Sequence, residues 1–265
     1  MMDLEPLSQL ISLKGKKALL TGAASGIGKA TAIRFAEAGA DLELVDINEK
    51  GLEETKRLAE TFGVKVNTYV VDLAKKGEID DLWNNLKDDP PDILVNNAGV
   101  YWFRKFTEVD EALYRRVLEI NLNSVFWMCQ HFIKLRKERG GVIINVSSIE
   151  AFLPFAPGLV HYDVAKLGVV ALTRAIAREY GRKIRANVVV PGGIETEGVK
   201  KLKREAVMKL DMEKISISFN FRARLPMGRF GNPDEVARVI LFLASDLSSY
   251  VNGAIIPVDG GFLST

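Results

Sequence analysis

The sequence is poor in the side chains that form disulfides and bind transition metals. Its 265 residues include one cysteine, Cys129, and two histidines. A lone thiol has no partner within the chain for a disulfide, and these three side chains are too few for a zinc cage made of Cys and His. We therefore expect neither an internal disulfide nor a metal at the functional site.

Long apolar runs and a strong net charge are also missing. No apolar run reaches the roughly 18 residues that a membrane span needs, and the first residues lack the basic and apolar segments of a secretory signal. The 36 Lys and Arg residues nearly balance the 34 Asp and Glu residues, so the formal net charge of +2 gives no reason to expect nucleic acid. We expect a cytoplasmic protein that binds neither a membrane nor nucleic acid.

Short apolar segments alternate with longer amphipathic ones along most of the chain. The apolar segments are rich in Val, Ile and Leu and do not alternate strictly with polar residues, as expected of strands covered on both faces. The predicted strands are Lys17–Leu20, Leu42–Asp46, Val66–Val71, Ile93–Val95, Val142–Val146, Ala186–Val190 and Ala254–Val258. The predicted helices cover residues 27–38, 49–62, 76–88, 108–138, 160–180 and 233–246.

This alternation predicts right-handed βαβ units that share one parallel sheet. We expect an α/β fold, a single Rossmann-type doubly wound sheet of about seven strands flanked by helices on both faces. No low-complexity linker or internal repeat divides the chain, so one domain is expected over residues 1–265. The run Asn232-Pro233-Asp234-Glu235 predicts a helix start, with a capping Asn, Pro at the first helical position and acids in the first turn.

One basic segment does not fit this alternation of strands and helices. Residues 200–224 carry eight basic and three acidic side chains, a local net charge of +5. The segment follows the turn Pro191–Thr196, which lies where a strand of the predicted sheet ends. We expect residues 197–225 to form a lid over the substrate, and a pair of solvated helices is the alternative.

A glycine-rich turn, Thr21–Gly28, joins the first predicted strand to the first helix. Its glycines let the backbone approach a pyrophosphate closely, and the helix N-terminus presents free N–H donors to that anion. Ordinary strand–helix turns also use glycine, but Asp46 ends the second strand eighteen residues after Gly28. A carboxylate there accepts hydrogen bonds from ribose hydroxyls and repels a 2′-phosphate, although Asp46 is alternatively a plain strand-end residue. The pattern predicts a dinucleotide site that favours NAD over NADP.

A tyrosine and a lysine lie four residues apart in the helical pattern 160–180. Tyr162 and Lys166 therefore project from one face of the helix. Tyrosine has an ordinary pKa of about 10 and is a poor base at neutral pH, but a nearby ammonium lowers that pKa. The pair alone is common by chance. It follows a strand pattern that ends in Ser147-Ser148, at the sheet edge where α/β proteins bind ligands, and this position favours a catalytic role.

The chain resembles the short-chain dehydrogenase/reductase family from about residue 13 onwards. Each matching segment is weak by itself, and together their order and spacing are specific to that family. The matching segments are Thr21–Gly28, Asp72-Leu73, Asn96–Gly99, Asn121, Ser147-Ser148, Tyr162 with Lys166, Pro191-Gly192 with Thr196, and Val258–Gly261.

The resemblance implies a role for each matching position. Tyr162 exchanges a proton with the substrate oxygen during hydride transfer, and Lys166 lowers the tyrosine pKa and binds the nicotinamide ribose. Ser148 stabilises the substrate oxygen, and Asn121 holds a water that links Lys166 to solvent. Asn121 is otherwise a buried polar residue that bends its helix. Asp72 and Leu73 then contact adenine, Asn97, Ala98 and Gly99 the adjoining ribose and the sheet, and Ile194 and Thr196 the carboxamide. The implied cofactor-binding residues are Gly22, Ser25, Gly26, Ile27, Gly28, Asp46, Asp72, Leu73, Asn97, Ala98, Gly99, Tyr162, Lys166, Pro191, Gly192, Ile194 and Thr196.

The sequence also departs from the family pattern near the serine. Fourteen residues separate Ser148 from Tyr162, where thirteen is commoner, so Ser147 is the alternative if the register slips. Glu150 stands where small residues are frequent. We interpret it as a solvated loop charge, with hydrogen bonding to a polyhydroxylated substrate as the alternative. The apolar segments Tyr101–Phe103 and Phe152–Pro157 line the substrate pocket or belong to the core or a subunit interface, and both histidines are expected to be structural.

The resemblance leaves the substrate open. The pattern Pro154–Pro157 followed by Val160-His161-Tyr162 is similar to that of bacterial glucose dehydrogenases in this family, which favours a sugar, polyol or other small hydroxy compound. A 3-oxoacyl-(acyl-carrier-protein) reductase is the alternative, since an acidic carrier suits the basic segment. A catalytically inactive nucleotide-sensing scaffold is a remote third, because the catalytic positions are intact.

Members of this family are usually tetramers or dimers, so the resemblance implies a homotetramer, with a dimer as the alternative. We expect three apolar side chains of the predicted helix 108–138 to supply contacts between subunits. They are Trp127, Met128 and Phe132.

Overall fold

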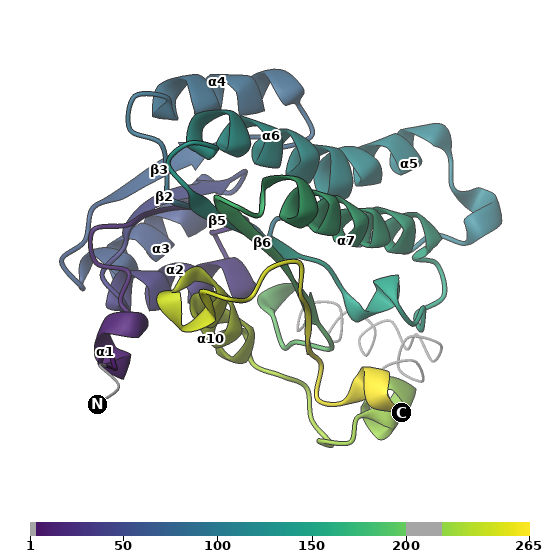
Figure 1. Ribbon diagram of the computed structural model, residues 1–265. Helices are drawn as coiled ribbons and strands as arrows, with labels where there is room; N and C mark the ends of the chain where they lie inside the picture. Colours follow the sequence, from purple (N-terminus) through teal and green to yellow (C-terminus); the bar gives the residue numbers. More distant parts are fainter. Residues whose placement is uncertain (1–3, 200–218) are drawn as a thin grey trace.

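The computed structural model describes residues 4–199 and 219–265, and its strands and helices alternate along the chain (Figure 1). The strands are β1 Lys17–Thr21, β2 Asp41–Asp46, β3 Val66–Val70, β4 Ile93–Asn96, β5 Gly141–Val146, β6 Ile184–Pro191 and β7 Ile255–Val258. The helices are α1 Leu7–Leu10, α2 Gly26–Glu37, α3 Glu49–Glu60, α4 Lys76–Leu86, α5 Glu111–Leu118, α6 Ser124–Arg136, α7 Val160–Tyr180 and α10 Pro233–Ala244. Residues 219–224 are also helical.

All seven strands form one parallel sheet in the order β3-β2-β1-β4-β5-β6-β7. The chain winds outwards from β1 in one direction and, after returning to β4, outwards in the other. The doubly wound sheet predicted from the sequence is therefore confirmed, and each strand boundary agrees with the prediction to within two residues. The reversal between β1 and β4 brings their C-terminal ends together, where sheets of this kind bind ligands.

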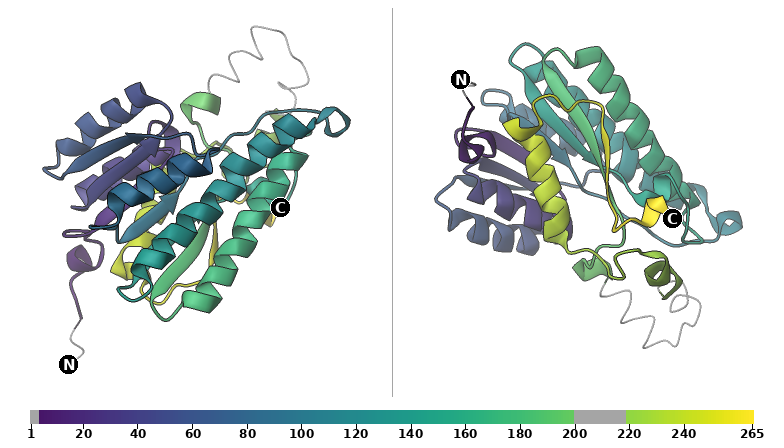
Figure 2. Two further views of the ribbon diagram at one scale, coloured as in Figure 1. Left: turned by 90° about the horizontal axis from the view of Figure 1, so that it is seen from above. Right: turned by 60° about the horizontal axis from the view of Figure 1, so that its bottom comes forward.

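Helices cover both faces of the sheet (Figures 1 and 2). α2, α3 and α10 form one layer, whose buried side chains include Phe35, Leu52 and Ile240. α4, α6 and α7 form the other layer, which buries Trp83 and Phe132. Because each strand lies between two apolar layers, its side chains are buried on both faces, which explains why the strands read as unbroken Val, Ile and Leu runs.

The side chains expected at a subunit interface lie elsewhere. Met128 and Phe132 are fully buried in the core between α6 and the sheet, and Trp127 is half-buried against the same core. The expectation for Met128 and Phe132 was wrong, because their spacing directs them to the inner face of α6. The large apolar side chains exposed on α6 and α7 are instead Phe126, Val160, Val164 and Leu167.

The predicted helix 108–138 is broken into parts. A single π turn, Glu119–Asn123, separates α5 from α6 and carries the buried Asn121. By contrast, the start predicted at Asn232 is confirmed: Asn232 Oδ1 accepts from Asp234 N at 2.9 Å, and Glu235 Oε2 accepts from Asn232 N at 2.8 Å. These two bonds form a capping box at the start of α10.

Some expectations lie outside what the structure describes. Of the predicted lid, 197–225, residues 200–218 fall outside the described residues, and most of the basic segment falls with them. In residues 4–199 and 219–265, no helix is long and apolar enough to cross a membrane. The same ranges contain no group of three or more His, Cys, Asp or Glu side chains placed to hold a metal ion.

Candidate active site

The glycine-rich turn lies between the end of β1 and the start of α2. Gly22 has a φ of 68°, and a Cβ there would lie 2.7 Å from Asn97 Nδ2. A Cβ on Gly28 would lie 2.0 Å from the carbonyl oxygen of Gly22. Both positions exclude any larger residue, because the backbone folds back on itself here. Ser25 is the N-cap of α2, and its side chain accepts no hydrogen bond from the first turn.

This geometry fits the pyrophosphate of a dinucleotide. The N-cap side chain of α2 accepts no hydrogen bond from the first-turn N–H groups, and the glycines leave the approach to these groups open. Asp46 lies beside the turn, where its carboxylate accepts hydrogen bonds from Ala24 N at 3.1 Å and from Asn48 N at 3.0 Å. Lys29, the cation nearest in sequence to the turn, is paired with Glu54 at 2.7 Å.

Thr21 and Asn97 tie the turn to the neighbouring strand. Thr21 Oγ1 accepts from Asn97 N at 3.0 Å and from Ala98 N at 3.1 Å. Asn97 Nδ2 donates to the carbonyl oxygens of Thr21 at 3.1 Å and Gly22 at 3.2 Å. The side chain of Asn97 is therefore used to hold the turn. This role of Thr21 was missed, although it is the first residue of the motif.

Asp72 and Leu73 follow β3 at the same sheet edge. Arg116 Nη2 donates to both carboxylate oxygens of Asp72 at 3.1 Å, and Asp72 Oδ1 accepts from Ala74 N at 3.1 Å. Leu73 is buried in the core. Hydrogen bonds to Arg116 and Ala74 N hold the pKa of Asp72 below its ordinary value in spite of its burial. The carboxylate thus remains charged, fixed at the edge next to β2.

Ser148, Tyr162 and Lys166 come together beyond the end of β5. The Ser148 hydroxyl lies close enough to the Tyr162 hydroxyl to lower the pKa of that tyrosine. Lys166 Nζ lies 5.7 Å from the centroid of the Tyr162 ring and donates to the carbonyl oxygen of Val146 at 2.9 Å. Tyr162 is half-buried and Lys166 is buried. The structure therefore brings together the three side chains that the sequence singles out, from β5 and from the first two turns of α7.

The pKa values of this group differ from the expectation that Lys166 lowers that of Tyr162. Burial raises the pKa of Tyr162, against the lowering effect of the Ser148 hydroxyl, and the charge of Glu150 raises it further. Burial also lowers the pKa of Lys166 to about 8. A buried ammonium is costly, because desolvation disfavours the charged form of an amine. In this structure, burial and not the neighbouring cation sets both values.

Asn121 fixes the backbone on the other side of Lys166. Its Oδ1 accepts from Val100 N at 3.1 Å, and its Nδ2 donates to the carbonyl oxygens of Val100 and Val117, each at 3.0 Å. A Cβ on Gly99 would lie 2.8 Å from Asn121 Oδ1 and 3.3 Å from Lys166 Nζ. Glycine at position 99 therefore keeps the lysine amine and the asparagine amide close, with only its own backbone between them.

Two expectations for the loop after β5 are settled by burial. Ser147 is buried, and its hydroxyl donates to the carbonyl oxygen of Lys166 at 2.8 Å. This bond anchors the helix, so Ser148 is the serine that faces Tyr162. Glu150 is 7% exposed and accepts from Phe155 N at 2.9 Å and Ala156 N at 3.3 Å. The interpretation as a solvated loop charge was wrong, because the loop folds back over this carboxylate.

Asp163, which the sequence did not single out, is a half-buried acid near the site. Its Oδ1 is buried and has no hydrogen-bond partner among the described residues. Burial, together with the nearby Glu150 charge, raises the pKa of Asp163 to about 7. The only signal in the sequence was that Asp163 directly follows Tyr162. The fold is needed to show that its Oδ1 is shielded from water.

The loop after β6, Pro191–Thr196, passes close to the glycine-rich turn. A Cβ on Gly26 would lie 3.1 Å from Thr196 Cγ2, and one on Gly192 would lie 2.8 Å from Asp259 Cα. Ile194 is buried, and its backbone forms a bridge with Gly231. The tight packing around both glycines places the loop between the turn and the C-terminal segment.

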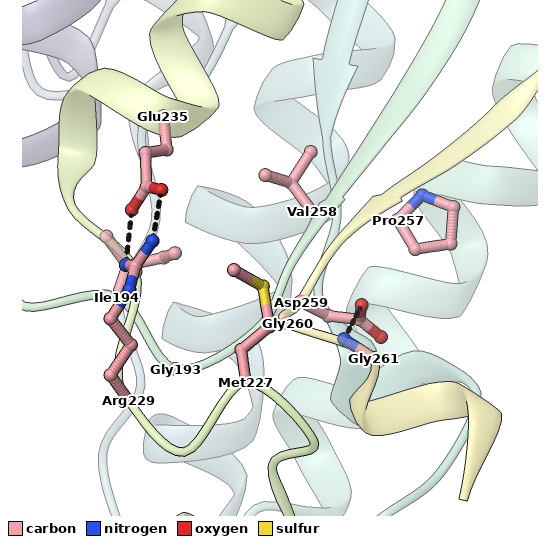
Figure 3. Close-up of a pocket in the computed structure, with 11 residues that line it drawn as sticks. Gly193, Ile194, Met227, Arg229, Glu235, Pro257, Val258, Asp259, Gly260 and Gly261 are labelled. Carbon is pink, nitrogen blue, oxygen red and sulfur yellow. Dashed lines mark hydrogen bonds and ion pairs between the residues drawn. The ribbon is translucent and has the colours of Figure 1, made fainter.

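Behind this loop lies a pocket of about 240 Å³, formed between the start of α10 and the turn after β7 (Figure 3). Arg229 and Glu235 form an ion pair at 2.7 Å on one side, and Asp259 accepts from Gly261 N on the other. The pocket contains no part of the Ser148, Tyr162 and Lys166 group in its lining. The proton-transfer residues therefore do not form this pocket.

Chemically, the group suits proton transfer at a substrate oxygen. A tyrosine hydroxyl and a serine hydroxyl meet at one point, and an amine lies behind the tyrosine ring. A general acid or base must lie within hydrogen-bond reach of the reacting oxygen, and two converging hydroxyls provide such a point. The glycine-rich turn, at the same sheet edge, presents donors suited to a phosphate.

Comparison with known proteins agrees with this assignment. A family model described as enoyl-(acyl carrier protein) reductase matches residues 22–263. The chain is 40% identical to a 3-oxoacyl-(acyl-carrier-protein) reductase of Thermotoga maritima, over 95% of this chain and 99% of that one. It is 36% identical to the 2-dehydro-3-deoxy-D-gluconate 5-dehydrogenase of Bacillus subtilis, over 97% and 98%. A proposed 2-deoxy-D-gluconate 3-dehydrogenase of Agrobacterium tumefaciens, solved with bound NADP, superposes with a TM-score of 0.86 at 32% identity, over 97% and 99%.

Proposed function

The chain belongs to the short-chain dehydrogenase/reductase family of NAD(P)-dependent oxidoreductases that act on CH–OH groups, and from this premise we propose that it interconverts a secondary alcohol and a ketone on a sugar, a sugar acid, a polyol or another small hydroxy compound. The observation that carries the proposal is the meeting of Ser148, Tyr162 and Lys166 beside the glycine-rich turn.

In this proposal Tyr162 is the general acid and base, and Ser148 is its partner. In the direction of oxidation the Tyr162 oxygen takes the hydroxyl proton of the substrate, and Ser148 donates a hydrogen bond to the oxygen that becomes the carbonyl. A nicotinamide cofactor held by the glycine-rich turn and Asp46 would supply the hydride acceptor for the carbon that bears this oxygen. Lys166 lies behind the ring, where Gly99 and Asn121 hold its surroundings, and a positive charge on it stabilises the phenolate.

We propose NAD as the preferred cofactor. Asp46 lies at the end of β2 with its carboxylate held by Ala24 N and Asn48 N, in the position that meets the adenosine ribose. Lys29 is engaged by Glu54 and thus is not placed to offset a 2′-phosphate. The binding of NADP by the Agrobacterium relative points the other way, so the preference is a property to be tested on this chain.

The supporting experiment measures kcat/KM for NAD and NADP with a panel of sugars, sugar acids, polyols and hydroxysteroids, followed at 340 nm. We expect turnover with at least one small hydroxy compound and a higher kcat/KM for NAD. In Asp46→Ser, we expect the ratio to move towards NADP. Tight cofactor binding with no turnover of any compound on the panel would favour a nucleotide-sensing scaffold instead.

A second candidate function is reduction of a 3-oxoacyl-(acyl-carrier-protein). It is favoured by the relative from Thermotoga maritima, at 40% identity over nearly the whole of both chains. Adding 3-oxoacyl thioesters to the same panel separates the two candidates. A kcat/KM for a thioester far above that of any sugar or polyol supports the second candidate.

We also propose that the chain assembles as a homotetramer. Phe126, Val160, Val164 and Leu167 are large apolar side chains exposed on α6 and α7, and burial of such side chains favours association. Sedimentation at micromolar concentration tests this. A stable monomer contradicts it, and a dimer would limit the association to one interface.

A further inference from the structure

Tyr101 lies directly against the proposed catalytic tyrosine. The rings of Tyr101 and Tyr162 pack edge to face, with centroids 6.4 Å apart and an angle of 71° between planes. Tyr101 is half-buried, and burial raises the pKa of its hydroxyl, so it stays protonated at neutral pH. An aromatic ring in this contact occupies space beside the point where a substrate oxygen must reach the Tyr162 hydroxyl.

The backbone on both sides of Tyr101 is held by elements that carry the active site. Val100, the residue before it, exchanges two hydrogen bonds with the Asn121 amide on the π turn. The carbonyl oxygen of Trp102, the residue after it, accepts from His161 Nε2 at 2.9 Å. His161 is buried and immediately precedes Tyr162 on α7. Tyr101 thus projects from a backbone that is fixed to the same helix as the proposed general acid.

The far end of the Tyr101 side chain is held as well. Its hydroxyl lies beside the Thr196 hydroxyl, on the loop after β6, close enough for Thr196 to lower the pKa of Tyr101 against the effect of burial. A Cβ on Gly198 would lie 3.2 Å from the Tyr101 hydroxyl oxygen, so the chain passes close by at that point. The ring therefore bridges the loop after β4 and the loop after β6. Moving the ring aside would lose its contacts with Thr196 and Tyr162.

We propose that Tyr101 is a specificity-determining residue: its fixed ring is a wall beside Tyr162 that admits small ketones and alcohols and rejects those with long substituents on both sides of the reacting carbon. This inference rests on the proposed oxidoreductase function and deepens it. It also gives the buried His161 a role, which is to hold the wall through the Trp102 carbonyl. A well-packed wall is effective because a single misplaced methylene in an apolar pocket costs about 10–200-fold in kcat/KM.

The test compares two substrates in wild type and variants. The small substrate is the best sugar, sugar acid or polyol ketone of the panel, and the large one is 3-oxooctanoyl-coenzyme A. In Tyr101→Ala we expect kcat/KM for the large substrate to rise at least about tenfold relative to the small one. In Tyr101→Phe, which keeps the ring and loses only the hydroxyl beside Thr196, we expect the wild-type size preference with a KM raised about threefold.

Three further variants keep the outcome interpretable. Tyr101→Leu fills part of the space and serves if the alanine variant is unfolded by circular dichroism. Tyr250 is fully exposed, so Tyr250→Ala and Tyr250→Phe make the same chemical changes away from the site and should leave the ratio unchanged. A merely structural role for Tyr101 would lower kcat/KM for both substrates alike.

The outcomes separate this inference from the proposed function. If wild type turns over small ketones and neither Tyr101→Ala nor Tyr101→Leu changes the ratio by more than twofold, the wall is wrong and the oxidoreductase stands. If wild type already prefers 3-oxooctanoyl-coenzyme A, both the small-substrate proposal and the wall fail. If wild type turns over nothing with either cofactor, the oxidoreductase itself is wrong, and the wall falls with it.

Discussion

The edge of the sheet where the strands end has two functional parts, the glycine-rich turn after β1 and the proton-transfer group beyond β5, and they are built in opposite ways. At the end of β1, the turn is shaped by glycines whose positions admit no Cβ, and the polar side chains around it, Thr21, Asn97 and Asp46, are bonded to backbone groups. Beyond β5, titratable side chains with displaced pKa values gather, among them the buried Lys166 and the half-buried Asp163. The first part is a fixed shape that suits a phosphate, and the second is a shielded environment that suits proton transfer.

The difference shows how one fold separates binding from chemistry. Backbone N–H groups at a helix N-terminus need no ionisable partner to bind an anion. General acid–base work, by contrast, needs groups whose pKa values are moved by burial and neighbouring charge. The two requirements are met by different strands of one sheet, so changes in one part should leave the other intact. Four predictions test this separation, from the largest effect to the smallest.

Tyr162→Phe should abolish chemistry and spare binding. Loss of the proton-transferring hydroxyl is expected to lower kcat about 10²–10⁴-fold, whereas the dissociation constant for the cofactor should change little, because the glycine-rich turn is untouched. Steady-state kinetics and fluorescence titration with NADH measure the two. Tyr180→Phe, at the opposite end of α7, is the control and should behave as wild type. Full turnover by the Tyr162 variant would falsify the acid–base assignment.

Gly28→Ala should do the reverse, by damaging binding first. Its new Cβ would lie 2.0 Å from the carbonyl oxygen of Gly22, so the turn must open. Overpacking of this kind costs about 1–3 kcal/mol of stability, and we expect cofactor affinity to fall at least about tenfold as the N–H donors shift. Gly77→Ala is the matched control, since its Cβ meets nothing within 4 Å and α4 gains a better helix former. Calorimetry and cofactor titration measure both quantities, and equal affinities in the two variants would contradict the prediction.

Asp163 should make the folded state less stable as the pH rises. Burial raises its pKa from an ordinary value of 3.8 to about 7, so between these values the folded chain binds more protons than the unfolded one. The free energy of unfolding therefore falls as the pH rises through this window, by roughly 1–3 kcal/mol for this group.

Urea unfolding from pH 4 to pH 8 checks this by comparing wild type with Asp163→Asn. The variant should lose that part of the pH dependence and be more stable than wild type at pH 8. Asp88→Asn, which alters an exposed carboxylate, should keep the wild-type slope. Parallel curves for wild type and Asp163→Asn would show that the site is less shielded than the structure indicates.

Glu150→Gln should produce the smallest effect, a shift in the pH profile of kcat. The charge of Glu150 raises the pKa of Tyr162, so its removal should move the acidic limb of the profile for alcohol oxidation, where Tyr162 becomes protonated, to lower pH by less than about one unit. Gln keeps an acceptor for Phe155 N, so the loop should hold. A profile that does not move, in a variant with wild-type unfolding behaviour, would remove Glu150 from the electrostatics of the site.

Much of this molecule follows from local sequence pattern. The strands are predicted to within two residues because each is an unbroken apolar run covered on both faces. The capping box at Asn232 follows from four consecutive residues, and the shared face of Tyr162 and Lys166 follows from helical periodicity. The sequence could place Asn121 on a helix. It could not predict the π turn or the hydrogen bonds between the Asn121 amide and the Val100 backbone, since these depend on a loop twenty-one residues away.

The sequence by itself determined the order of strands and helices, the glycine-rich turn and the residues of the proton-transfer group, because these depend on spacing along the chain. Only the tertiary structure decided which charges lie away from water. Glu150 is read locally as a solvated loop residue, and Phe132 as a contact between subunits. Glu150 is buried because its own loop folds back over it, and Phe132 because α6 packs against the sheet. The direction of each pKa shift and the wall formed by Tyr101 have the same origin. Burial is a property of the surrounding packing, which residue spacing along one segment does not specify.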